Sequence, residues 1–192
     1  MRRIEEFYKN TRNTLPHKNV LEFIDSEKNI GKAIDIGCGA GRDTVYLIKN
    51  GWHVIAIDKE NTKQIMTNQL NDEELNRLTF IQSEFENIKL EKNNLIIANY
   101  SIPFCNKNKF QEFWHKIIDS IEENGYFVGN FLGKNDEWNT QKSSMTFFSR
   151  KTVEELFNNF EILKFEEEEK DAKTGLGIMK HWHTYNIIAR KK

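Results

Sequence analysis

The chain has 192 residues, enough for one domain with a complete hydrophobic core, and we expect residues 1–192 to form a single domain. Its 28 Lys and Arg residues nearly balance its 29 Asp and Glu residues, which leaves no net positive charge to attract nucleic acid or an anionic membrane surface. The sequence also lacks a run of about 18 to 20 apolar residues that could cross a bilayer, and its start lacks an apolar signal core. We therefore expect a cytoplasmic protein whose partner is a small molecule.

The two cysteines, Cys38 and Cys105, lie far apart in the sequence and form no Cys-x-x-Cys pair. Cysteines placed in this way predict neither a disulfide framework nor a zinc site. We expect two reduced thiols and no metal site.

The predicted elements of the first half alternate between helices and strands, after a helical N-terminal segment over residues 1–30 that is a candidate lid. The sequence predicts a helix over 18–27, a strand over 32–36, a helix over 42–50, a strand over 52–57, a helix through 64–70, and strands over 79–82 and 95–98. Gly51 follows the second of these helices and suits the left-handed position past a helix end.

The second half continues the alternation and ends in two strands. The clearest amphipathic helix begins at Phe110 and keeps apolar residues at helical spacing through Ile121. After it the sequence predicts a strand over 126–132, a helix from the capping Ser149 through Phe157, and strands over 161–168 and 182–189 joined by a glycine-containing loop. This order predicts an α/β protein with a doubly wound, mostly parallel sheet, helices on both faces and a final antiparallel strand.

A glycine-rich loop follows the first predicted strand. Gly37, Gly39 and Gly41 let the backbone turn sharply and let a ligand approach the N–H groups at the start of the next helix. Asp35 stands near the end of the first strand and Asp58 at the end of the second. In such sheets ligands bind beyond the carboxyl ends of the strands, and an acidic residue placed like Asp58 accepts hydrogen bonds from a ribose diol.

Two residues argue against a dinucleotide as that ligand. The dinucleotide fingerprint is GxGxxG or GxGxxA, but Arg42 occupies its last position, where a long side chain would obstruct close packing of helix and strand. Asp35 would repel a pyrophosphate, whereas it suits a ligand with an ammonium or sulfonium charge. An NAD(P)-dependent oxidoreductase and a non-catalytic nucleoside-binding protein of the same fold remain the alternatives.

The segments DIGCGAGRD (35–43) and VIAID (54–58) resemble the first two motifs of the class I S-adenosylmethionine-dependent methyltransferases. ANYSIPF (98–104), MTFFSRKTVEELF (145–157) and KHWHTYNIIAR (180–190) further resemble small bacterial methyltransferases of the tellurite-resistance type. The resemblance covers almost the whole chain. It implies a Rossmann-like seven-stranded sheet of order 3-2-1-4-5-7-6 with strand 7 antiparallel, the cofactor S-adenosyl-L-methionine, and transfer of a methyl group.

The resemblance also implies roles for residues near the strand ends. The loop 37–41 would hold the methionine part of the cofactor, Asp35 would lie near its amine, and Asp58 would bind the ribose hydroxyls. The third motif of the family usually supplies an acidic residue to the adenine amino group, and here Glu84 is the candidate. Phe85, which follows it, is a candidate adenine contact.

Two further places complete the cofactor site implied by the resemblance. Asn99 would present its backbone carbonyl and side chain to the amino acid end of the cofactor, and Tyr100 would face the reaction centre. Tyr8 and Arg12 are four residues apart on a predicted N-terminal helix that could close over the cofactor, with Arg12 pairing with its carboxylate.

The catalytic residues are less determined than the cofactor site. Methyl transfer from a sulfonium is an in-line displacement that proximity and exclusion of water accelerate, so it requires no protein nucleophile or metal. His181 and His183 would share one strand face near the rim of the glycine loop, where one of them could serve as a general base. A hydrogen-bonded structural pair is the competing interpretation, and Tyr100 is the third catalytic candidate. The acceptor stays open among metalloid oxyanions, thiol-like compounds and other metabolites, and so does the oligomeric state.

Overall fold

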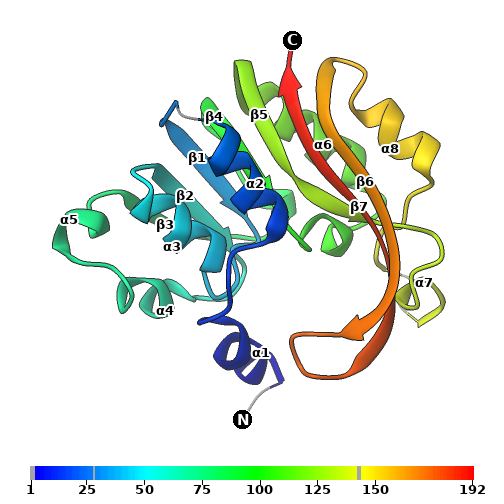
Figure 1. Cartoon of the computed structure of the whole chain (residues 1–192), viewed down its shortest axis with the longest axis horizontal. Helices are drawn as coiled ribbons and strands as arrows, with labels where there is room; N and C mark the ends of the chain where they lie inside the picture. The colour runs from blue at the N-terminus through cyan, green and yellow to red at the C-terminus, as the bar shows by residue number, and fades with distance from the viewer. Residues whose placement is uncertain (1–2, 28, 142–143) are drawn as a thin grey trace.

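The computed structural model describes residues 3–27, 29–141 and 144–192, so Met1, Arg2 and Lys28 of the predicted N-terminal segment lie outside the described residues. Figure 1 shows a central twisted sheet with helices on both faces. The strands are β1 (Lys32–Ile36), β2 (His53–Asp58), β3 (Leu78–Gln82), β4 (Asn93–Ala98), β5 (Ile121–Leu132), β6 (Phe160–Lys173) and β7 (Met179–Lys191).

The helices fall at most of the predicted places. They are α1 (Arg3–Thr11), α2 (Lys18–Ser26), α3 (Arg42–Lys49), α4 (Lys63–Thr67), α5 (Asp72–Leu75), α6 (Phe110–Ser120), α7 (Trp138–Gln141) and α8 (Arg150–Leu156), with 3-10 turns η1 (Phe85–Asn87) and η2 (Ile102–Phe104). The predicted end signals are confirmed: Ser149 accepts a hydrogen bond from the backbone N–H of Thr152 at the start of α8, and Gly51 has a φ of 92° after α3.

The strand order is β3-β2-β1-β4-β5-β7-β6, which confirms the predicted sheet. The first five strands pair in parallel, while β7 pairs antiparallel with both β5 and β6. The carboxyl ends of β1, β2 and β4 therefore lie at one edge of the sheet. Because β7 runs in the opposite direction, its beginning lies at that same edge (Figure 1).

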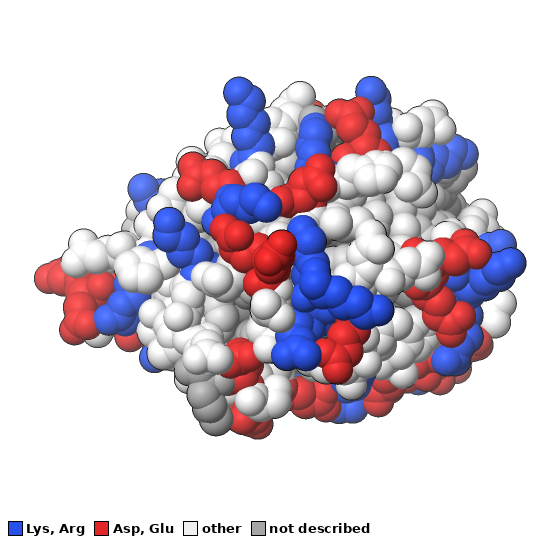
Figure 2. Space-filling view, turned by 90° about the horizontal axis from the view of Figure 1, so that it is seen from above, with Lys and Arg blue, Asp and Glu red and all other residues white. Residues whose placement is uncertain are grey.

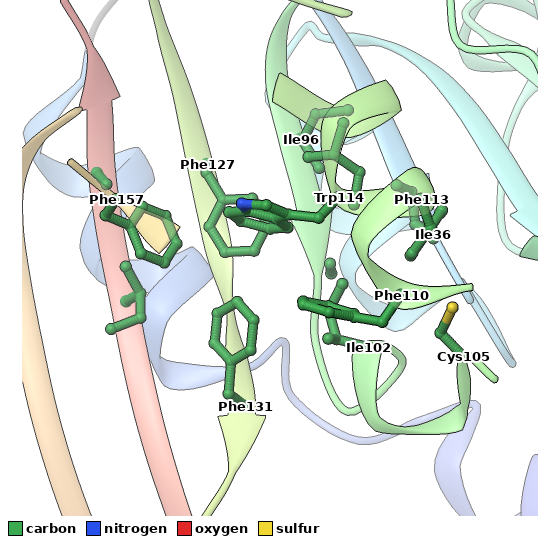
Figure 3. Packing of buried hydrophobic residues seen from close by; sticks show 14 of the residues in the cluster. Ile36, Ile96, Ile102, Cys105, Phe110, Phe113, Trp114, Phe127, Phe131 and Phe157 are labelled. Atoms are coloured by element: carbon green, nitrogen blue, oxygen red, sulfur yellow. The ribbon is translucent and has the colours of Figure 1, made fainter. Parts of the chain in front are cut away.

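Two apolar clusters cover the two faces of the sheet. On one face, α6 and α8 pack against the central strands through aromatic residues, and the ring of Trp114 lies 5.2 Å from Phe127 and 5.3 Å from Phe157 (Figure 3). On the other face, Val20 and Phe23 of α2 and the apolar side of α3 cover β1, β2 and β4. Most residues of β1, β2 and β4 are thus buried, which leaves the ends of these strands as the place where polar groups can meet a ligand.

Several predicted bounds are wrong. The helix predicted through 64–70 ends at Thr67, because Asn71 and Glu74 form a capping box that starts the separate helix α5. The strand predicted over 126–132 begins at Ile121, directly after α6.

The last two strands are also longer than predicted. The acidic stretch 166–173 continues as β6, because its residues stay in register with β7 out to the pair Lys173 and Met179. The glycine-containing loop expected between the last two strands is therefore a tight turn in which the N–H of Thr174 donates to the carbonyl of Ile178. The resulting hairpin extends past the sheet to α1, where Asn10 donates to the carbonyl of Gly175 at 3.2 Å.

Candidate functional site

The glycine loop between β1 and α3 has a backbone that other residues adopt only with strain. Gly37, Gly39 and Gly41 have φ angles of 71°, 56° and 81°. A Cβ atom on Gly37 would lie 2.5 Å from the Cβ of Ser101, and one on Gly41 would lie 2.1 Å from the Cγ of Met66. The loop thus needs glycine for its turn and for the close approach of neighbouring chain segments.

Asp58, the last residue of β2, joins the glycine loop to the neighbouring strand. Its Oδ2 accepts the backbone N–H of Gly39 at 2.8 Å, and its Oδ1 accepts the backbone N–H of Glu60 at 2.9 Å. The hydroxyl of Tyr8 on α1 lies 3.5 Å from the same Oδ1. Asp58, the predicted partner of the ribose hydroxyls, therefore lies beside the glycine loop. Tyr8 of the candidate lid lies next to the Asp58 carboxylate.

Asp35 is buried next to the loop, on the face of β1 that α3 covers. Its Oδ2 accepts the hydroxyl of Thr44 at 2.6 Å. Burial, and after it the negative charge of Asp43, raise the pKa of Asp35 to about 8, against a weaker opposing effect of the Thr44 hydrogen bond. A nearby cation would lower this raised pKa, because the cation favours the ionised form of the carboxyl group.

A buried polar network that the sequence analysis missed connects α2, α3 and the end of β4. Asp43 accepts hydrogen bonds from the ring Nδ1 of His17 at 2.6 Å and from the side-chain amide of Asn99 at 2.8 Å. Asn19 in turn donates to Asn99 Oδ1 at 2.7 Å. Although burial opposes it, contact with His17 lowers the pKa of Asp43. Asn99 thus lies where the resemblance implied, but inside a network that also includes His17 and Asp43.

Tyr100 follows Asn99 and adopts a left-handed backbone with a φ of 52°. The side-chain oxygen of Asn130 accepts its N–H at 2.8 Å and helps to hold this conformation. The Tyr100 ring lies 5.2 Å from His17 and 5.3 Å from Trp182 of β7. Strained residues of this kind are concentrated at functional sites, so the backbone supports a functional position for Tyr100.

Two buried polar atoms near this edge have no hydrogen-bond partner within the described residues. They are the hydroxyl of Ser101, next to Gly37, and the side-chain oxygen of Asn19. Buried polar atoms are nearly always paired, so the orphaned Ser101 hydroxyl beside the glycine loop leaves room for a polar ligand group.

The two adenine candidates lie after β3. Glu84 is exposed and precedes η1, so its carboxylate is accessible to a ligand. Phe85 is half-buried and stacks on Phe113 at 5.2 Å, and its ring edge would lie 3.5 Å from a Cβ on Gly37. Phe85 thus belongs to the core and also borders the glycine loop.

A cleft of about 440 Å³ separates α1 from the loop after β2. It is lined by Ile4, Glu5, Tyr8, Lys9, Arg12, Glu60, Asn61, Thr62 and Ile65. Arg12 is exposed and also borders a second hollow of about 280 Å³ over α4. The structure thus brings Arg12 to the outer rim of the site beside Tyr8, not to the buried network around Asp43.

His181 and His183 share one face of β7 near the rim, as predicted, but Trp182 between them is the residue that contacts Tyr100. His183 is buried on the α8 face, where its Nε2 lies 3.0 Å from Glu167 and its Nδ1 accepts the N–H of Asn135 at 3.1 Å.

His181 lies 2.9 Å from Asp171, and this hydrogen bond raises its pKa. Among the described residues, Glu167, Glu169 and His183 also offer ligand atoms within 4.8 Å of one another, a spacing that a metal ion could bridge. Both histidines therefore face acidic groups of the β6–β7 hairpin.

Two further features of the protein are the length and polarity of its helices and the mixture of charges on its surface. Within residues 3–27, 29–141 and 144–192, the helices are too short or too polar to cross a membrane. Figure 2 shows Lys and Arg side chains interspersed with Asp and Glu over the face seen from above.

The family of the tellurite resistance protein TehB matches residues 1–175. TehB from Haemophilus influenzae superposes with a TM-score of 0.78 at 19% identity, over 97% of this chain and 66% of that one.

Two further similar proteins have names or bound ligands that contain an S-adenosyl group. The 1,6-didemethyltoxoflavin-N1-methyltransferase from Burkholderia thailandensis, solved with 1,6-didemethyltoxoflavin and S-adenosylhomocysteine, gives a TM-score of 0.69 at 15% identity over 91% of this chain and 76% of that one. Carboxy-S-adenosyl-L-methionine synthase from Nautilia profundicola is 27% identical over 99 residues, which make up 50% of this chain and 42% of that protein.

The strand order, the reversed β7 and the similarity to these structures define the fold of the class I S-adenosylmethionine-dependent methyltransferases. Because the family match covers most of the chain, the protein belongs to the TehB family. It covers less than half of the curated relative and 66% of the Haemophilus structure.

Proposed function

We propose that this protein is an S-adenosylmethionine-dependent methyltransferase that acts on a small-molecule acceptor. One observation carries the proposal: a glycine loop with positive φ angles lies between two buried carboxyl groups, Asp35 and Asp58, at the carboxyl edge of the sheet. Carboxyl groups on both sides of a loop suit a ligand that carries ammonium and sulfonium charges and a ribose diol. The family and the fold support the same ligand.

The proposed cofactor contacts follow the geometry of the loop. The methionine part lies along residues 37–41, with its ammonium group near Asp35. The ribose hydroxyls bind Asp58, whose oxygens already accept two backbone N–H groups that fix the carboxylate in place. Asn99 contributes its backbone carbonyl beside the methionine part. These contacts together would place the sulfonium near Tyr100.

The remaining cofactor contacts lie further out. Glu84 binds the adenine amino group and Phe85 contacts the ring, which its position next to Gly37 supports. Tyr8 of α1 and Arg12, directly after α1, close over the nucleoside, and Arg12 pairs with the cofactor carboxylate from the rim of the cleft. In this proposal residues 1–192 act as one domain and the N-terminal segment acts as its lid.

The chemistry would need little beyond position. S-adenosylmethionine supplies an activated methyl group, and the protein residues align the acceptor with it and exclude water. The half-buried rings of Tyr100 and Trp182 form an apolar wall for the acceptor beside the cofactor. A small acceptor is supported by the neighbour that methylates 1,6-didemethyltoxoflavin. The role of His181 or His183 as a general base stays a prediction.

Two other functions fit the same fold. An NAD(P)-dependent oxidoreductase is disfavoured by Asp35, which lies beside the loop where a pyrophosphate would have to bind, and by Arg42 at the last fingerprint position. A non-catalytic nucleoside-binding protein would keep the cofactor site but would transfer no methyl group to any acceptor.

Calorimetry distinguishes these functions at the level of binding. S-adenosylhomocysteine is expected to bind with a dissociation constant in the micromolar range, whereas NADH is not expected to bind. Asp58→Ala removes the carboxylate that is proposed to bind the ribose hydroxyls. It should weaken the binding of S-adenosylhomocysteine about tenfold to a hundredfold, the cost of one or two charged hydrogen bonds. Asp72→Ala, on the exposed start of α5, is the matched control. Binding of NADH alone would contradict the proposal.

Activity needs a separate experiment, because the acceptor is unknown. The protein is incubated with methyl-labelled S-adenosylmethionine and a metabolite extract, and labelled products are identified by mass spectrometry. A labelled small molecule that disappears with Asp58→Ala supports the proposal. Cofactor binding without any labelled product would favour the non-catalytic alternative.

A further inference from the structure

His17 is the residue before α2, and its side chain lies inside the candidate site. Its Nδ1 lies 2.6 Å from Asp43 Oδ2, and its backbone N–H donates to Asp43 Oδ1 at 2.8 Å. Asp43 is only 4% exposed and also accepts the amide of Asn99. A buried carboxylate therefore holds the imidazole ring in one orientation, next to the residue that follows β4.

The two partners of the His17 ring determine which nitrogen carries the proton. Nδ1 faces the carboxylate of Asp43, which accepts a hydrogen bond, and Nε2 contacts the guanidinium of Arg42, which can only donate one. The neutral ring therefore carries its proton on Nδ1 and has a lone pair on Nε2. Orientation of a histidine base by a carboxylate at Nδ1 is the arrangement found in hydrolase triads.

The His17 ring borders the place expected for the acceptor. Its centroid is 5.2 Å from that of Tyr100, whose ring contacts Trp182 at 5.3 Å. The three rings form one aromatic wall beside Asn99, which is the proposed contact of the cofactor's methionine part. His181 and His183 do not share this position, because they point to the other face of β7.

We propose that His17, oriented by Asp43, is the general base of methyl transfer, and that the acceptor is an aromatic molecule with a protonated nucleophile. This inference rests on the proposed function. A lone pair of an S–H, N–H or O–H group attacks the methyl carbon, and the methyl–sulfur bond breaks with its electron pair moving to sulfur. The proton of the acceptor moves to Nε2 of His17. The products are the methylated acceptor, S-adenosylhomocysteine and an imidazolium that returns its proton to water.

The charged and titratable groups that face the ring, among the described residues, are Asp43 and Arg42 from α3 and Tyr100 after β4. Asp43 stabilises the imidazolium form of His17, whereas Arg42 opposes it. Because Nε2 has to be free to take the proton, the acceptor displaces Arg42 from Nε2 when it binds. The Arg42 guanidinium also donates to the hydroxyl of Thr14 at 3.1 Å, and this exposed hydrogen bond is easily exchanged for one to water.

Nitrogen-15 NMR of the histidine rings tests the orientation without any acceptor. The full chain is measured at pH 8 with S-adenosylhomocysteine, and the His17 signal is assigned by its loss in His17→Gln. A neutral ring protonated on Nδ1 is expected, and Asp43→Asn should change the tautomer. A neutral ring protonated on Nε2, or a ring still charged at pH 8, would overturn the proposal.

Kinetics test the role in catalysis with four probes: benzyl mercaptan, tryptamine, catechol and tellurite. The first three carry a proton that the reaction must remove, and tellurite can react through a lone pair without losing one. His17→Gln is expected to lower kcat with a protic probe about a hundredfold or more. His115→Gln, on the exposed side of α6, is the matched control.

Binding of S-adenosylhomocysteine separates this inference from the proposed function. Affinity within twofold of the original in His17→Gln, combined with the loss of kcat, supports the general base. An unchanged kcat with the protic probes, or methylation of tellurite alone, would overturn it while leaving the methyltransferase assignment intact. Failure of the original protein to bind S-adenosylhomocysteine would instead refute the proposed function.

Discussion

Lowering the pH from 8 to 6 is expected to weaken the binding of S-adenosylhomocysteine about 50-fold. The proposed site places the ammonium group of the ligand near Asp35, and an ionised carboxylate attracts that cation. Burial, and then the charge of Asp43, raise the pKa of Asp35 to about 8 in the free protein. Below that pH the carboxyl group is protonated, so ligand binding must release a proton.

The magnitude follows from the linkage between ligand and proton. If only the ionised site binds, the apparent dissociation constant is multiplied by 1 + 10^(pKa − pH). With a pKa of about 8 for Asp35, this factor is about 2 at pH 8 and about 100 at pH 6. The affinity therefore rises with pH, and at pH 7 about 0.9 proton leaves for each ligand bound.

Isothermal titration calorimetry measures both quantities. Titrations at pH 6, 7 and 8 give the affinities, and buffers of different ionisation enthalpy at pH 7 give the number of protons released. Asp35→Asn is the control, because an amide oxygen can still accept the hydroxyl of Thr44 but the group no longer titrates. The variant is expected to bind weakly and with little dependence on pH.

An affinity that stays constant from pH 6 to 8, with no proton released, would refute the placement of the ligand ammonium near Asp35. The same shift has a consequence for the free protein. A raised carboxyl pKa stabilises the folded state only while the group is protonated, so this contribution is present below pH 3.8 and is lost as the pH rises towards about 8.

Three substitutions test other parts of the account. Gly37→Ala puts a methyl group on a backbone with a φ of 71° and is expected to cost about 1 to 3 kcal/mol in a thermal melt and to abolish binding of S-adenosylhomocysteine. The ammonium group of Lys180 on β7 forms a buried ion pair with Asp136 at 2.5 Å. Lys180→Met removes the ammonium group and leaves the Asp136 carboxylate unpaired, so it should cost about 3 to 5 kcal/mol in urea unfolding; full retained stability would argue against that pair. Replacing His181 and His183 together with Asn separates them from His17 as the base: methyl transfer within twofold of the original supports His17, and a hundredfold loss supports His181 or His183.

The sequence predicted the parts of the site that lie next to strand ends in a short segment. Asp35 and the glycine loop fall within seven residues, and Asp58 ends the next strand. Because parallel strands bring their carboxyl ends to one edge, strand order alone places these groups together. The reversed β7 was predictable for a related reason, since a tight connection from β6 requires antiparallel pairing.

The parts of the candidate site that the sequence did not predict depend on tertiary packing. His17 and Asp43 are 26 residues apart, and they meet because α2 packs across the sheet and brings its first turn to the start of α3. No periodic pattern encodes that contact. Alternation along a strand predicted that His181 and His183 share a face, but register and the neighbouring helices decide which face it is.

The most direct test of the account is a crystal structure with S-adenosylhomocysteine bound. The account predicts the nucleoside at the carboxyl edge of the sheet, with its ribose hydroxyls within hydrogen-bond distance of Asp58 and its methionine part along residues 37–41. A crystal that shows the nucleoside bound elsewhere, with Asp58 still contacting only protein groups, would contradict it.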